Sequence, residues 1–195
     1  MEKPDHILFE LQKMSIDLAL INRNHYLANT TRRENDIEHS FTIALLCWYI
    51  HDRYKIDLDI AKILKYALSH DFVERYAGDV NTFASTEDRQ QKVKDEAAAL
   101  ARLSTEFSDF PDLVLKMANY ELRQDDESLF VWTVDKMQQL IMGGLDNWRP
   151  YREISITFER FCDKYTEQLR KSSPYLRDIF DGLIEYSKAT YTTKP

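Results

Sequence analysis

Apolar residues recur at helical spacing along most of the chain, and this periodicity restricts its fold more than any other feature. Positions i, i+3, i+4 and i+7 are apolar in a series of segments. The predicted helices span about 5–21, 37–54, 59–70, 87–104, 109–121, 127–147, 151–171 and 175–189. No segment reads convincingly as a strand, and only 4 glycines are available for the tight turns of a sheet protein. The sequence therefore predicts an all-α fold.

Length and charge restrict the protein further. A chain of 195 residues has room for one hydrophobic core, so residues 1–195 are predicted to form a single-domain helical bundle. The formal net charge of −7 disfavours binding to a nucleic-acid polymer through a basic face. The most apolar run, residues 41–50, is too short to span a bilayer, and no secretory pattern opens the chain. A cytoplasmic location without a membrane partner is therefore expected.

The two cysteines and two of the histidines carry no predicted chemistry. Cys47 and Cys162 lie within apolar helical patterns, which favours small core residues over a disulfide. His6 and His51 have no neighbouring residues that would complete a metal site.

A dense polar cluster closes the predicted helix at 59–70. His70 and Asp71 follow a run whose apolar residues mark a buried face, and Glu74 lies on their side if the helix continues. Burying an acid is costly unless it is paired, hydrogen-bonded or bound to metal. An imidazole beside a carboxylate is a good ligand pair for a divalent ion. The cluster therefore points to a metal site.

Two residues from distant helices could complete the coordination sphere. His39 lies near the start of the helix at 37–54, and Asp135 interrupts the apolar face of the helix at 127–147. A purely structural alternative is that His70 and Asp71 cap a helix end while Asp135 pairs with Lys136. That alternative leaves His39 and Glu74 unexplained.

The order His39, His70-Asp71, Asp135 on three helices resembles the HD-domain metal-dependent phosphohydrolases. Further matches resemble the 5′-deoxynucleotidase-like branch of that superfamily: Glu34-Asn35, Glu38-His39-Ser40, His70-Asp71-x-x-Glu74-x-x-x-Gly78-Asp79, Glu127 and Asp135-Lys136. The resemblance covers about residues 15–150, and the helices at about 151–190 are expected to pack on this core.

This resemblance implies a hydrolase with one divalent ion bound by His39, His70, Asp71 and Asp135. The mixed nitrogen and oxygen ligands leave Mn, Co, Fe, Zn and Mg open. Such an ion activates water and polarises a phosphoryl oxygen, which is the chemistry of phosphate-ester hydrolysis. Glu74 is placed to orient or deprotonate the water. Asp79 is placed to protonate the leaving oxygen or to bind a sugar hydroxyl.

The expected substrate is a small phosphomonoester, with a nucleoside 5′-monophosphate favoured. Arg32 is the first candidate for the phosphate contact, followed by Arg33 and Arg23, because arginine suits multidentate phosphate binding. A solvated loop is the alternative for all three. The deoxynucleotidases carry an Arg-Trp pair before the first metal histidine, whereas Asn24-His25 stands at that place here. His25 or Tyr26 is available to stack on a sugar or base.

Three alternatives stay open at the level of sequence. The enzyme could act on another phosphate ester or a pyrophosphate, or the chain could be a nucleotide-binding regulator with weak hydrolysis. A helical interaction module without a site would not explain the clustered His, Asp and Glu. Aromatic residues at helical spacing after residue 150 are predicted to form core or the surface of a homodimer.

Overall fold

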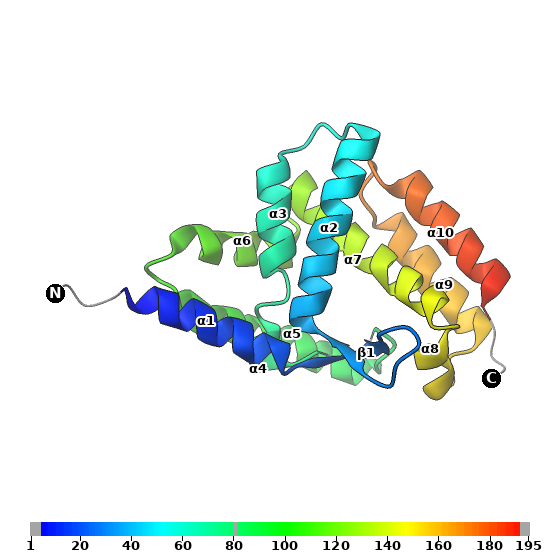
Figure 1. Ribbon diagram of the computed structural model, residues 1–195, viewed down its shortest axis with the longest axis horizontal. Coiled ribbons are helices and arrows are strands. Elements are labelled where there is room, and N and C mark those ends of the chain that lie inside the picture. Colours follow the sequence, from blue (N-terminus) through cyan, green and yellow to red (C-terminus); the bar gives the residue numbers. More distant parts are fainter. Residues whose placement is uncertain (1–4, 80–81, 192–195) are drawn as a thin grey trace.

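The computed structural model describes residues 5–79 and 82–191, and this part of the chain is mostly helical (Figure 1). The helices are α1 (His6–Ala19), α2 (Asp36–Tyr54), α3 (Ile60–Ser69), α4 (Glu74–Ala77), α5 (Thr86–Glu106), α6 (Pro111–Leu122), α7 (Asp126–Leu145), α8 (Arg149–Glu153), α9 (Phe158–Arg170) and α10 (Arg177–Thr190). The strands are β1 (Asn22–Tyr26) and β2 (Arg33–Asn35). The all-α prediction is confirmed, with a small hairpin added.

Helices α2, α3 and α7 form the centre of the molecule. Helix α2 crosses the middle of the view in Figure 1 and packs against α3 and α7, while α10 packs against α7 and α9. Their apolar faces bury a continuous core that includes Ile43, Ile63, Val134 and Phe180. A second cluster lies between α1, α5 and α6 around Leu18, Leu103 and Met117. The two cores fix the ends of the three central helices relative to one another.

The prediction that no strand exists was wrong for the segment before α2. Strands β1 and β2 pair antiparallel, with Asn22 opposite Asn35 and Tyr26 opposite Arg33. Arg33 lies over the Tyr26 ring, 4.6 Å from its centroid, and donates to the Asn24 carbonyl at 2.9 Å. Cross-strand contacts stabilise this short pairing, so local propensity in either strand alone carried little signal.

The prediction of one helix over 151–171 was also wrong. Helix α8 ends at Glu153 and α9 begins at Phe158, and Ser155 between them has a φ of 53°. Thr157 caps α9 by accepting from the backbone N–H of Arg160. The polar β-branched residue Thr157 favours a helix start over a helix interior. The break brings Tyr151 and Ile154 to the edge of a pocket described below.

Helix α4 has only four residues, yet it is held firmly. Arg75 donates from Nε to Asp17 of α1 at 2.7 Å and from Nη1 to Glu106 of α5 at 2.6 Å. This double ion pair clamps α4 between two longer helices and so fixes Glu74 at its start. In the described ranges, 5–79 and 82–191, no helix combines the length and the apolar character that crossing a membrane requires.

Candidate active site

His39 is positioned by the first turn of α2. Asn35 caps the helix by accepting from the Glu38 N–H at 3.0 Å, and Glu38 in turn accepts from the Asn35 N–H at 3.1 Å. This capping box satisfies two backbone donors and fixes the start of the helix. The His39 side chain is completely buried, with Nδ1 3.5 Å from Glu34 Oε2. Glu34 is itself held by Gln138, so it orients the ring from behind.

His70 and Asp71 lie just beyond the end of α3. His70 Nδ1 is 2.9 Å from the Ala67 carbonyl and donates to it, which leaves the lone pair on Nε2 facing inward. His70 Nε2 is 3.1 Å from Asp71 Oδ2. Neighbouring residues on a continuing helix would diverge by about 100°. The turn after Ser69 therefore lets both side chains reach the same point.

Asp135, in the middle of α7, completes the group. His39 Nε2 lies 3.2 Å from Asp135 Oδ1 and 3.6 Å from Asp71 Oδ2. Ligand atoms of His39, His70 and Asp135 all lie within 4.8 Å of one another. Two ligands about 2.1 Å from one ion are roughly 3 Å apart when they meet at a right angle. The structure thus brings three of the sequence-predicted ligands, His39, His70 and Asp135, to spacings that suit one ion. The fourth, Asp71, has Oδ2 3.1 Å from His70 Nε2 and 3.6 Å from His39 Nε2.

Three of the atoms that face this point lack a hydrogen bond, whereas Asp71 Oδ2 accepts from Arg23 and Asp135 Oδ2 accepts from Lys136, the pair that the structural alternative expected. His39 Nε2, His70 Nε2 and Asp135 Oδ1 are buried and make no hydrogen bond within the described part of the chain. Buried polar atoms are rarely left unpaired, because each costs about 1–3 kcal/mol. A divalent cation is the group that two imidazole nitrogens and two carboxylates would jointly accept. The donor set therefore fits a metal ion.

The electrostatics of the cluster also favour a cation. Burial alone would raise the pKa of Asp71, but His70 and Arg23 lower it, so the carboxylate stays charged. Burial and Arg23 would lower the pKa of His39, yet Asp135 and Glu34 raise it to about 9. The carboxylates thus hold a positive charge on an otherwise buried imidazole. A bound ion would supply that charge at the same place.

Glu74 lies beside the cluster and is not one of the predicted metal ligands. The side chain is buried, with Oε2 3.5 Å from Arg23 Nη1 and Oε1 3.6 Å from Lys92 Nζ. Burial, together with the charge of Asp71, raises the pKa of Glu74 well above its usual value. A raised pKa makes a carboxylate a stronger proton acceptor. Glu74 is therefore suited to proton transfer.

The comparisons with known proteins agree with this geometry. Residues 17–177 match the model of the HD domain family, which is most of the chain. The chain belongs to the HD-domain family. No curated protein matches it.

Two solved structures share this HD-domain fold. One is described as a predicted metal-dependent phosphohydrolase from Magnetospirillum magnetotacticum, with 21% identity, 98% of each chain covered and a TM-score of 0.79. The other is a conserved hypothetical protein from Pyrococcus furiosus, with 19% identity, 91% of this chain and 99% of that chain covered, and a TM-score of 0.60. At these identities the similarity establishes the fold.

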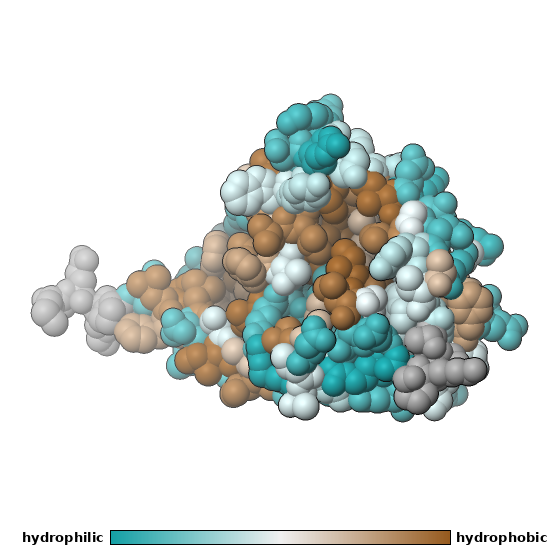
Figure 2. Space-filling model, turned by 45° about the vertical axis from the view of Figure 1, so that its right-hand side comes forward, coloured by the Kyte–Doolittle hydropathy of each residue, from teal (hydrophilic) through white to brown (hydrophobic). Residues whose placement is uncertain are grey.

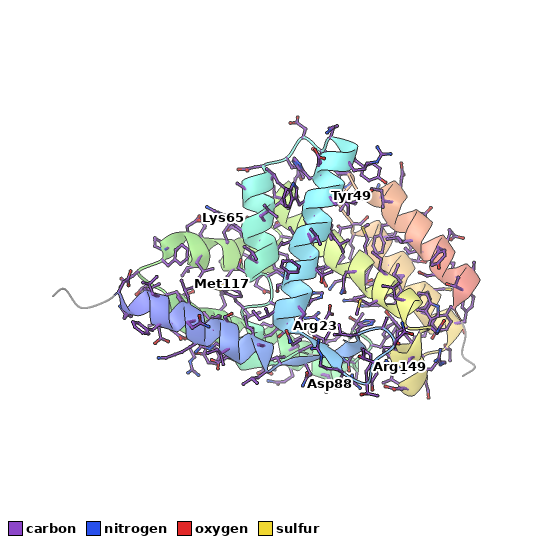
Figure 3. The ribbon with its side chains drawn as sticks, in the orientation of Figure 1. Arg23, Tyr49, Lys65, Asp88, Met117 and Arg149 are labelled. Carbon is purple, nitrogen blue, oxygen red and sulfur yellow. The ribbon has the colours of Figure 1, made fainter. Side chains whose placement is uncertain are left out.

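The hairpin of this HD domain decides which arginine reaches the site. Figure 3 shows Arg23 at the base of α2, next to β1. Its Nη1 lies 2.6 Å from Asp71 Oδ2 and 3.1 Å from Asp36 Oδ1. Arg32, the first candidate from sequence, instead makes a two-pronged exposed ion pair with Glu38 at 2.8 and 2.7 Å. Strand pairing carries Arg23 inward and leaves Arg32 at the exposed turn.

Arg33 and His25 also lie near the site, at different depths. The Arg33 guanidinium stacks on Tyr26 and contacts Glu153 at 3.7 Å, so the structure does not bring it to the cluster. His25 is largely buried, and its ring is 5.5 Å from that of Tyr151. Burial lowers the pKa of His25 to about 4, so its imidazole is neutral at pH 7.

Two adjoining hollows lie over the cluster. A polar cleft of about 670 Å³ contains His70, Asp71, Glu74 and Asp135. A second pocket of about 420 Å³ is lined on one side by His25, Phe83, Tyr151 and Ile154. The two share Arg23, Asp79, Thr82 and Gln139. Asp79, which the sequence placed in the site, therefore lies where the hollows meet.

Several residues of these hollows were missed at the level of sequence. Lys92 of α5 enters the cleft and pairs with both Glu74 and Glu96. Gln139, one turn after Asp135, lies under the junction, where its Oε1 accepts from Thr82 at 3.2 Å. Gln139 could have been predicted, because it is a glutamine on the apolar face of α7, one turn after Asp135. Lys92 lies on a highly charged helix, so nothing in the sequence distinguished it from the other charged residues there.

Proposed function

We propose that this HD-domain protein is a metal-dependent phosphohydrolase that releases phosphate from a small phosphomonoester, with a nucleoside 5′-monophosphate as the favoured substrate. The carrying observation is the cluster of His39, His70 and Asp135, with Asp71 and Glu74 beside it, next to a cleft that adjoins a partly apolar pocket. The cleft suits a phosphate and the pocket suits an uncharged ring.

The roles of the residues follow from their positions. His39, His70, Asp71 and Asp135 would hold one divalent ion, which when bound would polarise a phosphoryl oxygen and make water more acidic. Glu74 takes the proton as the water oxygen forms a bond to phosphorus. The bond from phosphorus to the ester oxygen breaks, and Asp79 protonates that oxygen. Alcohol and inorganic phosphate are the products.

The shape of the second pocket supports a nucleoside as the leaving group. Phe83 and Tyr151 lie edge to face, with ring centroids 5.8 Å apart, and His25 adds a neutral aromatic ring. Ring faces and edges of this kind bind a planar base. Asp79, Thr82 and Gln139 lie between this pocket and the cleft, where a sugar would lie. These polar side chains could form hydrogen bonds with the hydroxyl groups of the sugar.

A panel assay tests this function directly. Protein stripped of metal with a chelator and reloaded with Mn²⁺, Co²⁺, Zn²⁺ or Mg²⁺ is assayed for phosphate release from nucleoside 5′-monophosphates, sugar phosphates and pyrophosphate. We expect activity only with metal and the highest kcat/KM with nucleoside monophosphates. A higher kcat/KM with pyrophosphate would replace the phosphomonoester proposal by the alternative reaction. No hydrolysis of any substrate with any of these metals would contradict the proposed function.

Sugar preference gives a sharper prediction. Asn24 and His25 stand where an Arg-Trp pair would exclude a 2′ hydroxyl, so ribo- and deoxyribonucleotides should be hydrolysed at similar rates. We expect the ratio of kcat/KM for dAMP to that for AMP, and for dCMP to that for CMP, to stay below about a hundredfold, or roughly 2.7 kcal/mol. A larger preference for the deoxy form would show that another residue excludes the hydroxyl.

We also propose that α2 forms a homodimer interface. Phe41, Leu45, Trp48 and Tyr49 lie on the outward side of α2, and more than half of each residue's surface is exposed. Figure 2 shows apolar residues gathered below the polar apex of the molecule, where α2 ends. Residues 41–50 carry no charge, which is typical of the centre of an interface. Exposed aromatic side chains of about 150–250 Å² each supply a large part of the roughly 800 Å² that one partner buries.

A charge placed on this stripe should separate the copies. Two α2 helices related by a twofold axis would bring Leu45 and Trp48 against the same residues of the second copy. We expect the wild-type protein to sediment as a dimer and the double variant Leu45→Glu, Trp48→Glu as a folded monomer. Leu8→Glu on the exposed side of α1 is the control and should stay dimeric. A monomeric wild-type protein would contradict the homodimer and would favour a different partner for the stripe.

A further inference from the structure

Two buried carboxylates, Asp36 and Glu74, and the partly buried Asp71 form a second group that shares Asp71 with the proposed metal ligands. Oxygen atoms of Asp36, Asp71 and Glu74 lie within 4.8 Å of one another. Three carboxylates at such spacing are a typical ligand set for a hard divalent cation. Asp36 Oδ2 and Glu74 Oε2 are buried and accept no hydrogen bond within the described residues. The group thus has unused capacity for a cation.

The guanidinium of Arg23 already stands among these carboxylates. A single atom, Nη1, lies 3.1 Å from Asp36 Oδ1, 2.6 Å from Asp71 Oδ2 and 3.5 Å from Glu74 Oε2. The arginine is buried, and its charge is permanent at any pH at which the protein folds. One positive nitrogen surrounded by three carboxylates resembles an ion in its ligand sphere. Without it, the three carboxylates would lose the one cation that they share, and Lys92 would remain beside Glu74.

Asp71 connects the two groups. The same oxygen, Oδ2, lies 3.1 Å from His70 Nε2 on one side and 2.6 Å from Arg23 Nη1 on the other. A carboxylate shared in this way would bridge two ions if both places held metal. Here one of the two places is filled by a side chain of the protein.

We infer that Arg23 occupies the place of a second divalent ion and so limits the centre to one. The inference rests on the proposed metal site at His39, His70, Asp71 and Asp135. Within the part of the chain that the structure describes, the ion pairs of Arg23 with carboxylates use Nη1, so the rest of the fork is available to a phosphate in the cleft. Arg23 would then supply the second positive charge that a phosphoryl oxygen receives in two-metal enzymes.

Counting bound ions tests this inference without reference to catalysis. Chelator-stripped protein is saturated with Mn²⁺ and passed through a desalting column, and bound metal is measured by mass spectrometry. We expect one equivalent for the wild type and two for Arg23→Ala, because the substitution removes the cation that contacts all three carboxylates. Electron paramagnetic resonance should show an isolated ion in the wild type and an exchange-coupled pair in the variant.

Matched variants keep the test decisive. Arg32→Ala removes an arginine from the same hairpin outside the site, and Arg23→Lys keeps the positive charge, so both should bind one equivalent. Arg23→Gln, with similar length and no charge, replaces Arg23→Ala if circular dichroism shows that the latter is unfolded. One equivalent in a folded, uncharged Arg23 variant would overturn the inference while leaving the proposed function intact. A wild-type protein that binds no divalent ion would overturn the metal site itself.

Discussion

The variant Asp135→Ala is expected to lose the divalent ion and nearly all phosphate release. The ion's affinity should fall by at least about a hundredfold, since even the outer partners of metal ligands are worth 10- to 100-fold. Phosphate release should fall by about a thousandfold or more, because a bound ion contributes several kcal/mol to transition-state charge stabilisation. The loss follows from the position of Asp135 Oδ1, which is buried 3.2 Å from His39 Nε2.

Metal content, phosphate release and thermal unfolding measure this effect together. Added metal should raise the melting temperature of the wild type, because an ion at 100 times its Kd stabilises the folded state by about 2.7 kcal/mol. It should not do so in the variant. Asp112→Ala is the control, since Asp112 lies on α6 and forms ion pairs with Lys65 and Lys116, and it should retain the metal. Full metal occupancy in both Asp135→Ala and Asp71→Ala would refute the assigned ligand set.

The variant Glu74→Gln is expected to keep the metal and to lose turnover by about a hundredfold or more. Glutamine preserves the shape of the side chain and cannot take a proton from water. The raised pKa of Glu74, caused by burial and by the charge of Asp71, makes the native carboxylate an effective proton acceptor. The effect should appear in kcat with metal content unchanged, which separates a role in the reaction from a role as ligand.

Steady-state rates and metal analysis of the same preparation check this prediction. Glu121→Gln is a suitable control, because Glu121 lines the same cleft and burial raises its pKa to about 7, yet it lies outside the ligand cluster. Its substitution should change kcat only slightly. Unchanged phosphate release by Glu74→Gln would remove Glu74 from the proposed mechanism and leave the proton acceptor to be found among the other residues of the cleft.

Much of the fold could be predicted from local patterns. Helical periodicity predicted most helices to within a few residues, because each helix buries one apolar stripe and repeats it every turn. The hairpin escaped prediction, since a strand as short as Arg33–Asn35 exists through its pairing with Asn22–Tyr26. The break between α8 and α9 was missed because apolar spacing continues across it. Apolar periodicity shows which side of a helical segment is buried, but it does not reveal a break of a few residues in the helix.

The site residues show a similar division between what the sequence predicts and what it does not. Residue type and order singled out His39, His70, Asp71 and Asp135, because few other roles require such groups on apolar helices. Sequence placed Arg32 ahead of Arg23, because Arg32 lies just before Glu34-Asn35 in the segment that leads into the helix of His39. Strand register then turned Arg23 toward Asp71 and left Arg32 on Glu38. A one-residue change of register reverses the side to which a strand residue points.

By itself, the sequence determined the helical class and the residues able to bind a metal, because both depend on residue type and local spacing. Only the tertiary structure decided which charges meet. Lys92 reaches the cleft from a helix whose sequence spacing to His39 carries no information about distance. Arg23 among three carboxylates is likewise a product of packing, because the hairpin, α2 and α4 must all be in place before its guanidinium is surrounded.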